Sequence, residues 1–490
     1  MKNICLHFSV HQPFRLRSYR FFDIGQDHYY YDDFSNKSNA LTIAKRCYMP
    51  MNNLLLSLIN ANKKAFKVSF SISGSALEQF EMYTPEVIES FKQLAKTGCV
   101  EFVAETDAHS LISTVDKEEF ALQAQANVEK INALFGQEPK VFKNTGFVYS
   151  DELGEQVYNL GFSGILAEGA DQILGWKSPN FLYCCDRQPR LKVLLRNFKL
   201  TDDVALRFSR QTWSEWPLTA DKYTSWILKS LESEELVNLF FDYSTFGVYN
   251  RAESGIFDFF SAFVSMITAN KNVAFVTPSE IIKNLQPISV LSVPQYTSCA
   301  DEERDLSAWL GNNLQKQAFD TLSSLRRLVR AVNDDRLTSD WNRLQASENF
   351  HYMSTKFFNH EAGFSPYQTP YEAFINFMNI VSDFAEQLNK VPTGTKFGTL
   401  TKDELDAEIA KHTEILKELE DAKKKQKETK TTTKKSKKAV AKKSEKVASK
   451  KTETKNVVKG KKTTKTVKSE KEKTVAKKTT TKSTTKKTKK

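Results

Sequence analysis

The chain has 490 residues, more than a single hydrophobic core usually supports, so two or more domains are expected. Its formal net charge of +12 is unevenly distributed between two parts of the chain. Residues 421–490 hold 29 Lys and 6 acidic residues, whereas residues 1–420 hold 42 basic and 53 acidic residues. An acidic globular body therefore carries a basic tail, and the absence of any run near the roughly 20 apolar residues of a bilayer span argues against an integral membrane protein.

The six cysteines show neither CxxC spacing nor the density of a disulfide framework. In a chain of this length, such cysteines are typical of a reducing compartment. Residues 1–10 lack the extended apolar segment of a signal peptide and predict a first strand instead. We therefore expect a cytoplasmic location.

Short apolar runs alternate with helical periodicity up to about residue 290. Seven of these runs are predicted strands: 4–10, 67–72, 100–104, 141–145, 164–167, 236–242 and 273–276. Amphipathic helices are predicted between them, such as 85–96, with Thr84 as N-cap and Pro in the first turn, and 117–134. This alternation predicts an α/β fold with a parallel sheet. Seven strands suit a closed (β/α) barrel, although a doubly wound open sheet has the same periodicity.

The pattern becomes helical after residue 300. Residues 300–333, 336–345 and 370–388 carry apolar residues at three- and four-residue spacing, which predicts a helical bundle that closes over one end of the barrel. Residues 400–422 begin with a capping box of Thr401 and Glu404 and predict a further helix, either docked on the body or self-associating as a short coiled coil. The predicted domains are a barrel over 1–295, a helical domain over 296–420 and a tail over 421–490.

The tail contains no Leu, Ile, Phe, Tyr or Trp. Such a segment cannot bury enough apolar surface to offset its ordering entropy, so it is expected to be disordered. Its lysines would bind nucleic acid or another polyanion without sequence specificity, through counterion release and without an aromatic stacking platform. The alternatives are a solubilising segment and adhesion to an anionic surface.

Polar residues end several of the predicted strands: His11, Glu105, Asn144 and Asp242. In a parallel barrel, strand ends meet at the C-terminal face, where active sites lie. Hydrolysis of a bond between two sugars needs two carboxyl groups across that bond. The distribution therefore indicates a site at this face, although many barrel enzymes would share it.

Longer motifs follow one another along residues 1–390. They are HQP at 11–13, SISGSALEQFE at 71–81, VEFVAETDAHSL at 100–111, NTGFVYSDE at 144–152, RNFKLTDDVALRFS at 196–209, FDYSTFG at 241–247 and the segment 349–379. In this order they resemble the motifs of glycoside hydrolase family 57, in its α-amylase-like subgroup. The resemblance implies a seven-stranded (β/α) barrel followed by a helical domain. It also implies action on α-1,4-glucans or maltooligosaccharides by a retaining double displacement, with no metal and no organic cofactor.

The resemblance also implies roles for single residues. Asp242 matches the motif position of the general acid/base residue, although an Asp at this place can also simply cap the next helix. Five residues match motif positions that bind the substrate: His11, Gln12, Glu105, His109 and Glu348. A lone histidine after a strand is more often structural, so the sugar-contacting role of His11 depends on its HQP context.

The departures from the family motifs centre on Gly146, which falls where the family has its nucleophilic Glu. Glycine supplies no carboxylate and hence no covalent glycosyl intermediate. Ser244 also replaces a Glu, and the residues around Glu348 depart from a DHFYY-like pattern. Asp151 and Glu152 are expected to form an acidic first helical turn, too far away to replace the nucleophile. The sequence therefore predicts weak or absent catalysis.

The tryptophans and histidines raise two further kinds of site. Three tryptophans either stack on sugar rings or belong to the core: Trp213, Trp216 and Trp226. His7 and His11 share one face of a strand, but no neighbouring ligand run supports a metal site, and none is expected.

The favoured function is a glucan-binding or regulatory homologue, tethered to a polyanion by its tail. The alternatives are an active α-glucan hydrolase or 4-α-glucanotransferase with a rearranged nucleophile, and a structural barrel that binds no sugar.

Overall fold

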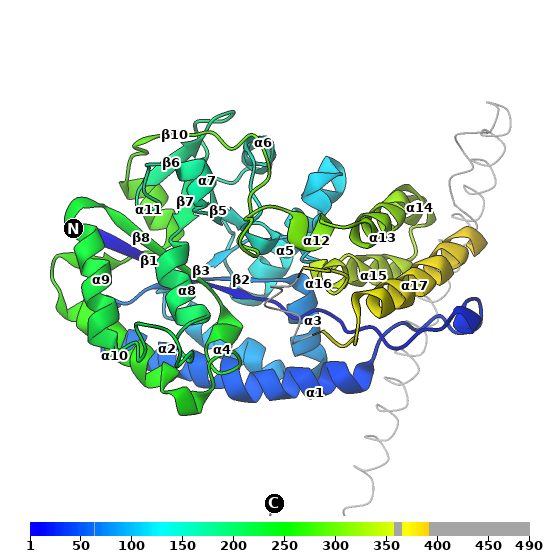
Figure 1. Ribbon diagram of the computed structural model, residues 1–490, viewed down its shortest axis with the longest axis horizontal. Coiled ribbons are helices and arrows are strands. Elements are labelled where there is room, and N and C mark those ends of the chain that lie inside the picture. The colour runs from blue at the N-terminus through cyan, green and yellow to red at the C-terminus, as the bar shows by residue number, and fades with distance from the viewer. Residues whose placement is uncertain (63, 357–364, 392–490) are drawn as a thin grey trace, which may run out of the picture. The chain divides into compact units, whose positions relative to one another are not determined.

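The computed structural model describes residues 1–62, 64–356 and 365–391 (Figure 1). All of these belong to one compact unit, Met1–Gly398. The predicted helix over 400–422 and the basic tail lie outside the described residues. The predicted domain boundary at residue 295 stays a prediction.

Seven parallel strands form the barrel, with most of their residues buried as parallel sheets require. They are β1 (Lys2–Val10), β2 (Val68–Ile72), β3 (Val100–Val103), β4 (Val141–Lys143), β5 (Gly164–Glu168), β7 (Lys192–Arg196) and β8 (Leu236–Asp242). Strand β1 pairs with β2 on one side and β8 on the other, β2 pairs with β3, and β5 lies between β4 and β7.

Two contacts join these groups of strands into a ring. A parallel bridge between Ala104 and Phe142 connects the end of β3 to β4. Past the end of β7, the Asn197 amide donates a hydrogen bond of 2.9 Å to the Asn238 carbonyl of β8. The predicted seven-stranded barrel is therefore confirmed in the described part of the chain.

One strand of the ring differs from the prediction. The run 273–276 forms β9 (Val273–Phe275), which pairs with residues 2–4 of β1, ahead of the point where β2 begins to pair. Its predicted place is taken by β7, whose outer edge also carries the short strands β6 (Leu182–Cys185) and β10 (Ser289–Leu291). An apolar run predicts a strand but not the edge that the strand joins, because local composition carries no information on pairing.

Helices connect the strands and surround the ring: α1 (Asp33–Ile43), α2 (Met49–Ala61), α3 (Gly74–Tyr83), α4 (Pro85–Lys96), α5 (Lys117–Phe135), α6 (Asp151–Asn159), α7 (Asp171–Leu174), α8 (Phe198–Ala205), α9 (Ala220–Ser233), α10 (Ile256–Ala269) and α11 (Pro278–Asn284). Both helices predicted in detail are present. Helix α5 begins where the Asp116 carboxylate accepts the amides of Glu118 and Glu119, and it ends at Gly136, which has a φ of +68°.

The predicted helical segment after residue 300 is also present: α12 (Ser307–Leu310), α13 (Asn313–Ser324), α14 (Arg326–Val332), α15 (Asp335–Leu344), α16 (Ser347–His351) and α17 (Pro370–Lys390). These helices share a second core with residues 14–31, which leave the barrel after β1 and run beside α17 (Figure 1). The Tyr19 amide donates to Asn376 at 2.7 Å, and the Tyr30 hydroxyl donates to Asp383 at 2.7 Å. Part of the N-terminal region therefore packs with the C-terminal helices.

Within the described ranges, no helix combines the length and the apolar character needed to cross a bilayer.

Candidate active site

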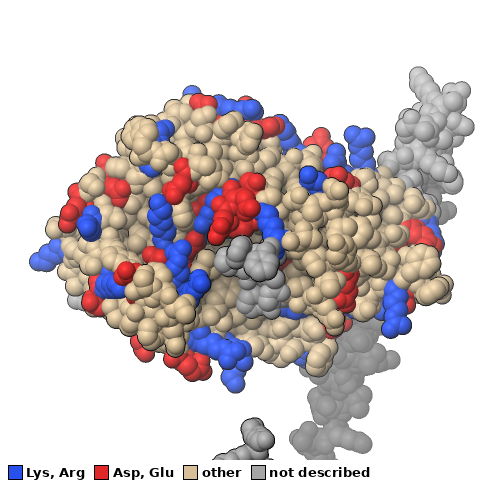
Figure 2. Space-filling view, in the orientation of Figure 1, with Lys and Arg blue, Asp and Glu red and all other residues tan. Residues whose placement is uncertain are grey.

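One pocket of about 340 Å³ lies where the barrel strands end. Six of the seven predicted site residues line it: His11, Gln12, His109, Gly146, Asp242 and Glu348. Residues that the sequence did not single out also line it, including Lys143, Arg196, Cys299, Trp309 and Lys356. Figure 2 shows acidic and basic side chains side by side near the middle of the face drawn.

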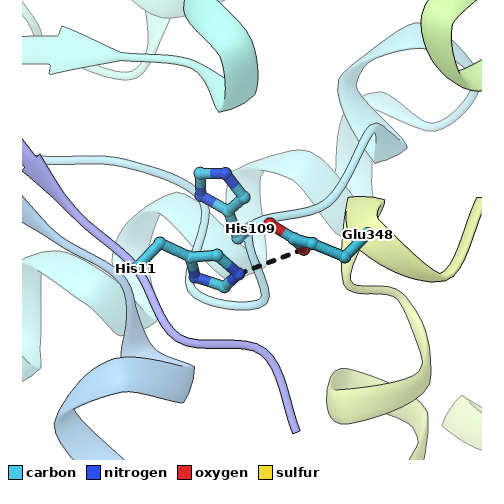
Figure 3. A group of neighbouring side chains, drawn as sticks. All are labelled: His11, His109 and Glu348. Carbon is cyan, nitrogen blue, oxygen red and sulfur yellow. Dashed lines mark hydrogen bonds and ion pairs between the residues drawn. The ribbon is translucent and has the colours of Figure 1, made fainter. Parts of the chain in front are cut away.

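His11, the first residue after β1, connects the barrel to the helices (Figure 3). Its Nδ1 lies 2.7 Å from the Ser73 hydroxyl, and its Nε2 lies 3.1 Å from Oε2 of Glu348 on α16. Burial alone would raise the pKa of Glu348, but the charge of His11 and the hydrogen bond from it outweigh burial and lower that pKa to about 2. Glu348 is therefore an oriented carboxylate at neutral pH.

His109 stacks on His11, with ring centroids 3.8 Å apart and ring planes 12° from parallel. Its backbone has a φ of +52°, a conformation that non-glycine residues rarely adopt. Burial, followed by the nearby charges of His11 and Lys143, lowers the pKa of His109 to about 4. The imidazole of His109 is therefore neutral at pH 7.

Glu105 lies beneath this pair, fully buried and outside the pocket lining. Its Oε2 lies 2.8 Å from the Lys143 ammonium and 3.4 Å from Nδ1 of His109. Burial would raise the pKa of Glu105, but the Lys143 charge and the contact with His109 lower it to about 2. These are the contacts of a residue that positions Lys143 and His109, so direct sugar contact by Glu105 stays a prediction.

One group of three metal-ligating side chains occurs among the described residues: His11, His109 and Glu348, with donor atoms within 4.8 Å of one another. A metal ion lies close to the plane of each imidazole that binds it, about 2.0–2.1 Å from the nitrogen for zinc. Two nearly parallel rings 3.8 Å apart cannot both direct a lone pair at one ion. This arrangement does not fit a formed metal site, and the expectation of no metal stays a prediction.

Gly146 lies in a short 3₁₀ turn, Thr145–Phe147, that follows β4, and its φ of +56° is in the left-handed region that favours glycine. Its carbonyl accepts a hydrogen bond of 2.8 Å from the Cys299 amide. Asp242 ends β8 and accepts the Ser244 amide at 2.7 Å, which caps the 3₁₀ turn Tyr243–Thr245. The position that lacks a carboxylate and the predicted acid/base residue therefore share one pocket, and Asp242 also has the capping role.

Asp151 and Glu152 begin α6, as predicted, and neither lines the pocket. The Val293 amide donates to Asp151 at 2.6 Å, and Glu152 pairs with Lys117 at 2.8 Å. Both carboxylates therefore contact groups away from the site.

The predicted tryptophans also lie outside the pocket lining. Trp213 and Trp226 pack against the barrel core with ring centroids 6.4 Å apart, whereas Trp216 is exposed.

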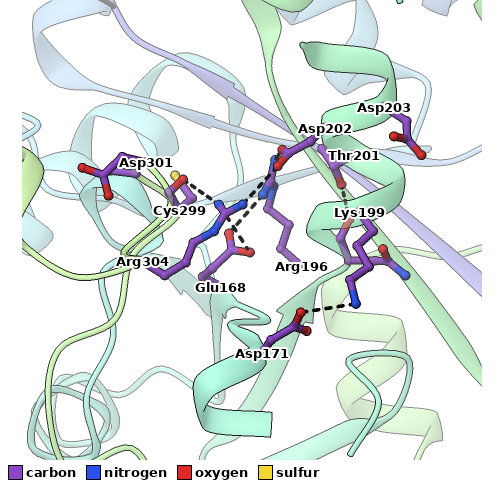
Figure 4. A network of polar contacts seen from close by, with 12 residues as sticks. Glu168, Asp171, Arg196, Lys199, Thr201, Asp202, Asp203, Cys299, Asp301 and Arg304 are labelled. Carbon is purple, nitrogen blue, oxygen red and sulfur yellow. Dashed lines mark hydrogen bonds and ion pairs between the residues drawn. The ribbon is translucent and has the colours of Figure 1, made fainter. Parts of the chain in front are cut away.

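A buried ionic network joins the ends of β5, β7 and β8 (Figure 4). Arg196, the last residue of β7, donates to Glu168 at 3.1 Å and to the Phe240 carbonyl at 3.0 Å, and it also pairs with Asp202. Arg304 reaches the same Asp202 at 3.1 Å. The sequence motif contained Arg196 and Asp202, but the contacts of Arg196 with Glu168 and the Phe240 carbonyl depend on β7 lying between β5 and β8.

The comparisons with known proteins agree with this fold. The family model for glycosyl hydrolase family 57 matches residues 5–294. A protein of Methanocaldococcus jannaschii named "Putative alpha-amylase" is 35% identical over 413 residues, which cover 80% of this chain and 86% of that protein. The chain belongs to glycosyl hydrolase family 57.

Solved structures share the fold at lower identity. A family 57 branching enzyme from Thermococcus kodakaraensis aligns with a TM-score of 0.59 at 11% identity, over 84% of this chain and 94% of that one. A 4-alpha-glucanotransferase from Thermococcus litoralis aligns with a TM-score of 0.55 at 17% identity, over 78% of this chain and 59% of that enzyme's chain.

Proposed function

We propose that this protein binds an α-1,4-glucan or maltooligosaccharide in the pocket and is weak or inactive as a retaining glycosidase. The observation that carries the proposal is Gly146, which lines the pocket together with Asp242 at the position where the family motif has its nucleophile.

The chemistry of retention explains the proposed loss. The mechanism needs two carboxyl groups about 5–5.5 Å apart, one to attack the sugar and one to exchange a proton. Asp242 supplies one carboxyl group, and Gly146 supplies none. Without a partner that forms the covalent intermediate, Asp242 alone does not complete the double displacement.

The groups suited to binding remain in place. His11 and Glu348 orient each other, and His109 supplies a neutral imidazole. Gln12 is also held, because its side-chain amide donates to the Tyr48 hydroxyl at 2.9 Å and its backbone carbonyl accepts from the Gln79 side chain at 2.9 Å. Polar groups fixed in this way bind hydroxyl-rich ligands at low entropic cost.

A second candidate is an active α-glucan hydrolase or 4-α-glucanotransferase with a rearranged nucleophile. It is favoured by two other carboxylates in the pocket lining, Asp301 and Glu348. Each of them already has a cationic or histidine partner: Asp301 pairs with Lys356 at 2.7 Å, and Glu348 pairs with His11.

One experiment separates the two candidates. The full-length protein is incubated with amylose, glycogen and maltoheptaose, while binding is measured by calorimetry and cleavage by the release of reducing ends. Binding without cleavage supports the proposal. Cleavage that Asp242→Asn abolishes establishes an active enzyme. An Asp301→Asn or Glu348→Gln variant that still binds glucan but no longer cleaves it, at saturating glucan, would then identify the substitute nucleophile. Absence of both binding and cleavage contradicts both candidates.

The sequence supports two further proposals. The 29 Lys of residues 421–490 favour binding to nucleic acid or another polyanion, which regulates or tethers the protein. The full-length chain should bind duplex DNA and should release it in 0.5 M salt, whereas a chain ending at residue 420 should not bind it.

All six cysteines are free in the structure, which favours the reducing environment of the cytoplasm.

A further inference from the structure

Trp309 of α12 lies where a side chain at position 146 would project. A Cβ atom built on Gly146 would lie 2.4 Å from Cη2 and 2.9 Å from Cζ2 of the Trp309 indole. Carbon atoms in contact are normally about 3.5–4.0 Å apart. The space beside Gly146 is therefore already filled by the edge of an aromatic ring.

The two residues before Trp309 are held by hydrogen bonds from other parts of the chain. Gln315 donates to the Ala308 carbonyl at 2.7 Å, and Lys356 donates to the Ser307 hydroxyl at 2.6 Å. The indole is 7% exposed and also lines the pocket. Because close-packed neighbours hold it, the ring cannot move aside without cost.

We propose that Trp309 is a ligand-contacting residue that forms the wall of the pocket at Gly146, in the space that a carboxylate-bearing side chain would need. The proposal rests on the proposed function, because the ligand it would touch is the glucan. Sugar rings present apolar C–H groups, and a rigid aromatic ring contacts them with little loss of side-chain entropy. Such a wall stabilises the bound sugar but supplies no group that attacks it, so it favours binding over cleavage.

The first test measures binding of maltoheptaose to full-length variants by calorimetry. Trp309→Ala should weaken binding about tenfold, and Trp309→Phe should retain part of the affinity. Trp176→Ala is the matched control, because Trp176 is 93% exposed and lies outside the pocket lining, and its affinity should equal that of the wild type. Equal affinity of the wild type and Trp309→Ala would overturn the proposed contact.

The second test measures the steric part by thermal unfolding and needs no ligand. Gly136 is a matched control for Gly146, because both have a ψ of 24° and a positive φ, but nothing lies within 4 Å of a Cβ built on Gly136. Gly136→Ala therefore reports backbone strain alone, and Gly146→Ala reports strain together with the clash.

Gly146→Ala should lower the melting temperature by about 4 °C more than Gly136→Ala does. In a protein that already carries Trp309→Ala, Gly146→Ala and Gly136→Ala should lower the melting temperature equally. Equal losses for the two alanine variants would overturn the steric assignment, whatever the ligand. A wild-type protein that binds no maltooligosaccharide would contradict the proposed function and, with it, the ligand contact. A wild-type protein that binds, with no effect of Trp309→Ala, would contradict the ligand contact alone.

Discussion

Lys143 and Glu105 form an ion pair beneath the pocket, with 2.8 Å between Nζ and Oε2 and side chains that are 2% and 0% exposed. The pair comes from the ends of neighbouring strands β4 and β3, so it forms only when these two strands lie side by side. Burial, followed by the Lys143 charge, lowers the pKa of nearby His7 to about 3, and the Glu105 charge acts in the opposite direction.

Removing one partner should therefore leave a buried, uncompensated charge. We expect Lys143→Met to reduce the free energy of unfolding by about 3–5 kcal/mol, as measured by urea titration. Lys117→Met removes the exposed partner of Glu152 and should cost less than about 1 kcal/mol. Similar losses in the two variants would show that the buried pair contributes no more than a surface pair.

Acidification should destabilise the protein, starting near pH 6.5. His7 and His109 have folded-state pKa values of about 3 and 4, below the unfolded value of about 6.5, so below that pH the unfolded chain binds more protons. Glu105 and Glu348 act in the same direction at lower pH, because their folded-state pKa values of about 2 lie below the unfolded value of about 4.3. The free energy of unfolding should fall steadily from pH 6.5 to pH 3.

His109→Gln tests whether His109 contributes to the loss of stability between pH 6.5 and pH 4. The variant lacks the titrating imidazole, so its stability should depend less on pH between 6.5 and 4 than that of the wild type. An unchanged slope would assign the effect to other groups.

The His11–Glu348 contact should matter for ligand binding as a unit. Either His11→Ala or Glu348→Ala removes the 3.1 Å hydrogen bond that orients both side chains, so each should weaken binding of maltoheptaose by about tenfold or more. Because the two residues share this bond, the double variant should bind nearly as well as the weaker single variant. Additive losses of affinity would show that the two residues contact the ligand independently. The control is Glu89→Gln on the exposed face of α4, which should leave the affinity unchanged.

Arg196 should contribute to stability through the several N–H donors of its planar guanidinium group. Arg196→Lys keeps the charge but cannot bond Glu168, Asp202 and the Phe240 carbonyl together, so we expect a loss of about 2–4 kcal/mol by urea titration. Arg207→Lys, in the more exposed pair with Asp203, should cost less than about 1 kcal/mol. A tolerated Arg196→Lys would show that charge alone holds the network.

Much of the site was predictable because a parallel barrel brings all its strand ends to one face. His11 follows β1 and Asp242 ends β8, and the register places these strands side by side, with Ser9 opposite Asp242. Six predicted residues therefore meet in one pocket although they are far apart in the sequence. The role of Arg196 was not predictable, because its partners Glu168 and Phe240 lie on β5 and β8, and a local apolar pattern does not encode which strands are neighbours.

The sequence by itself determined the alternation of strands and helices, the residues that end the strands, and the absence of a carboxylate at Gly146, because these follow from local pattern and composition. Only the tertiary structure decided that residues 14–31 pack with the C-terminal helices and that Trp309 fills the space beside Gly146. These contacts join segments far apart in the chain, and they depend on the shapes of packed side chains, which local periodicity does not encode.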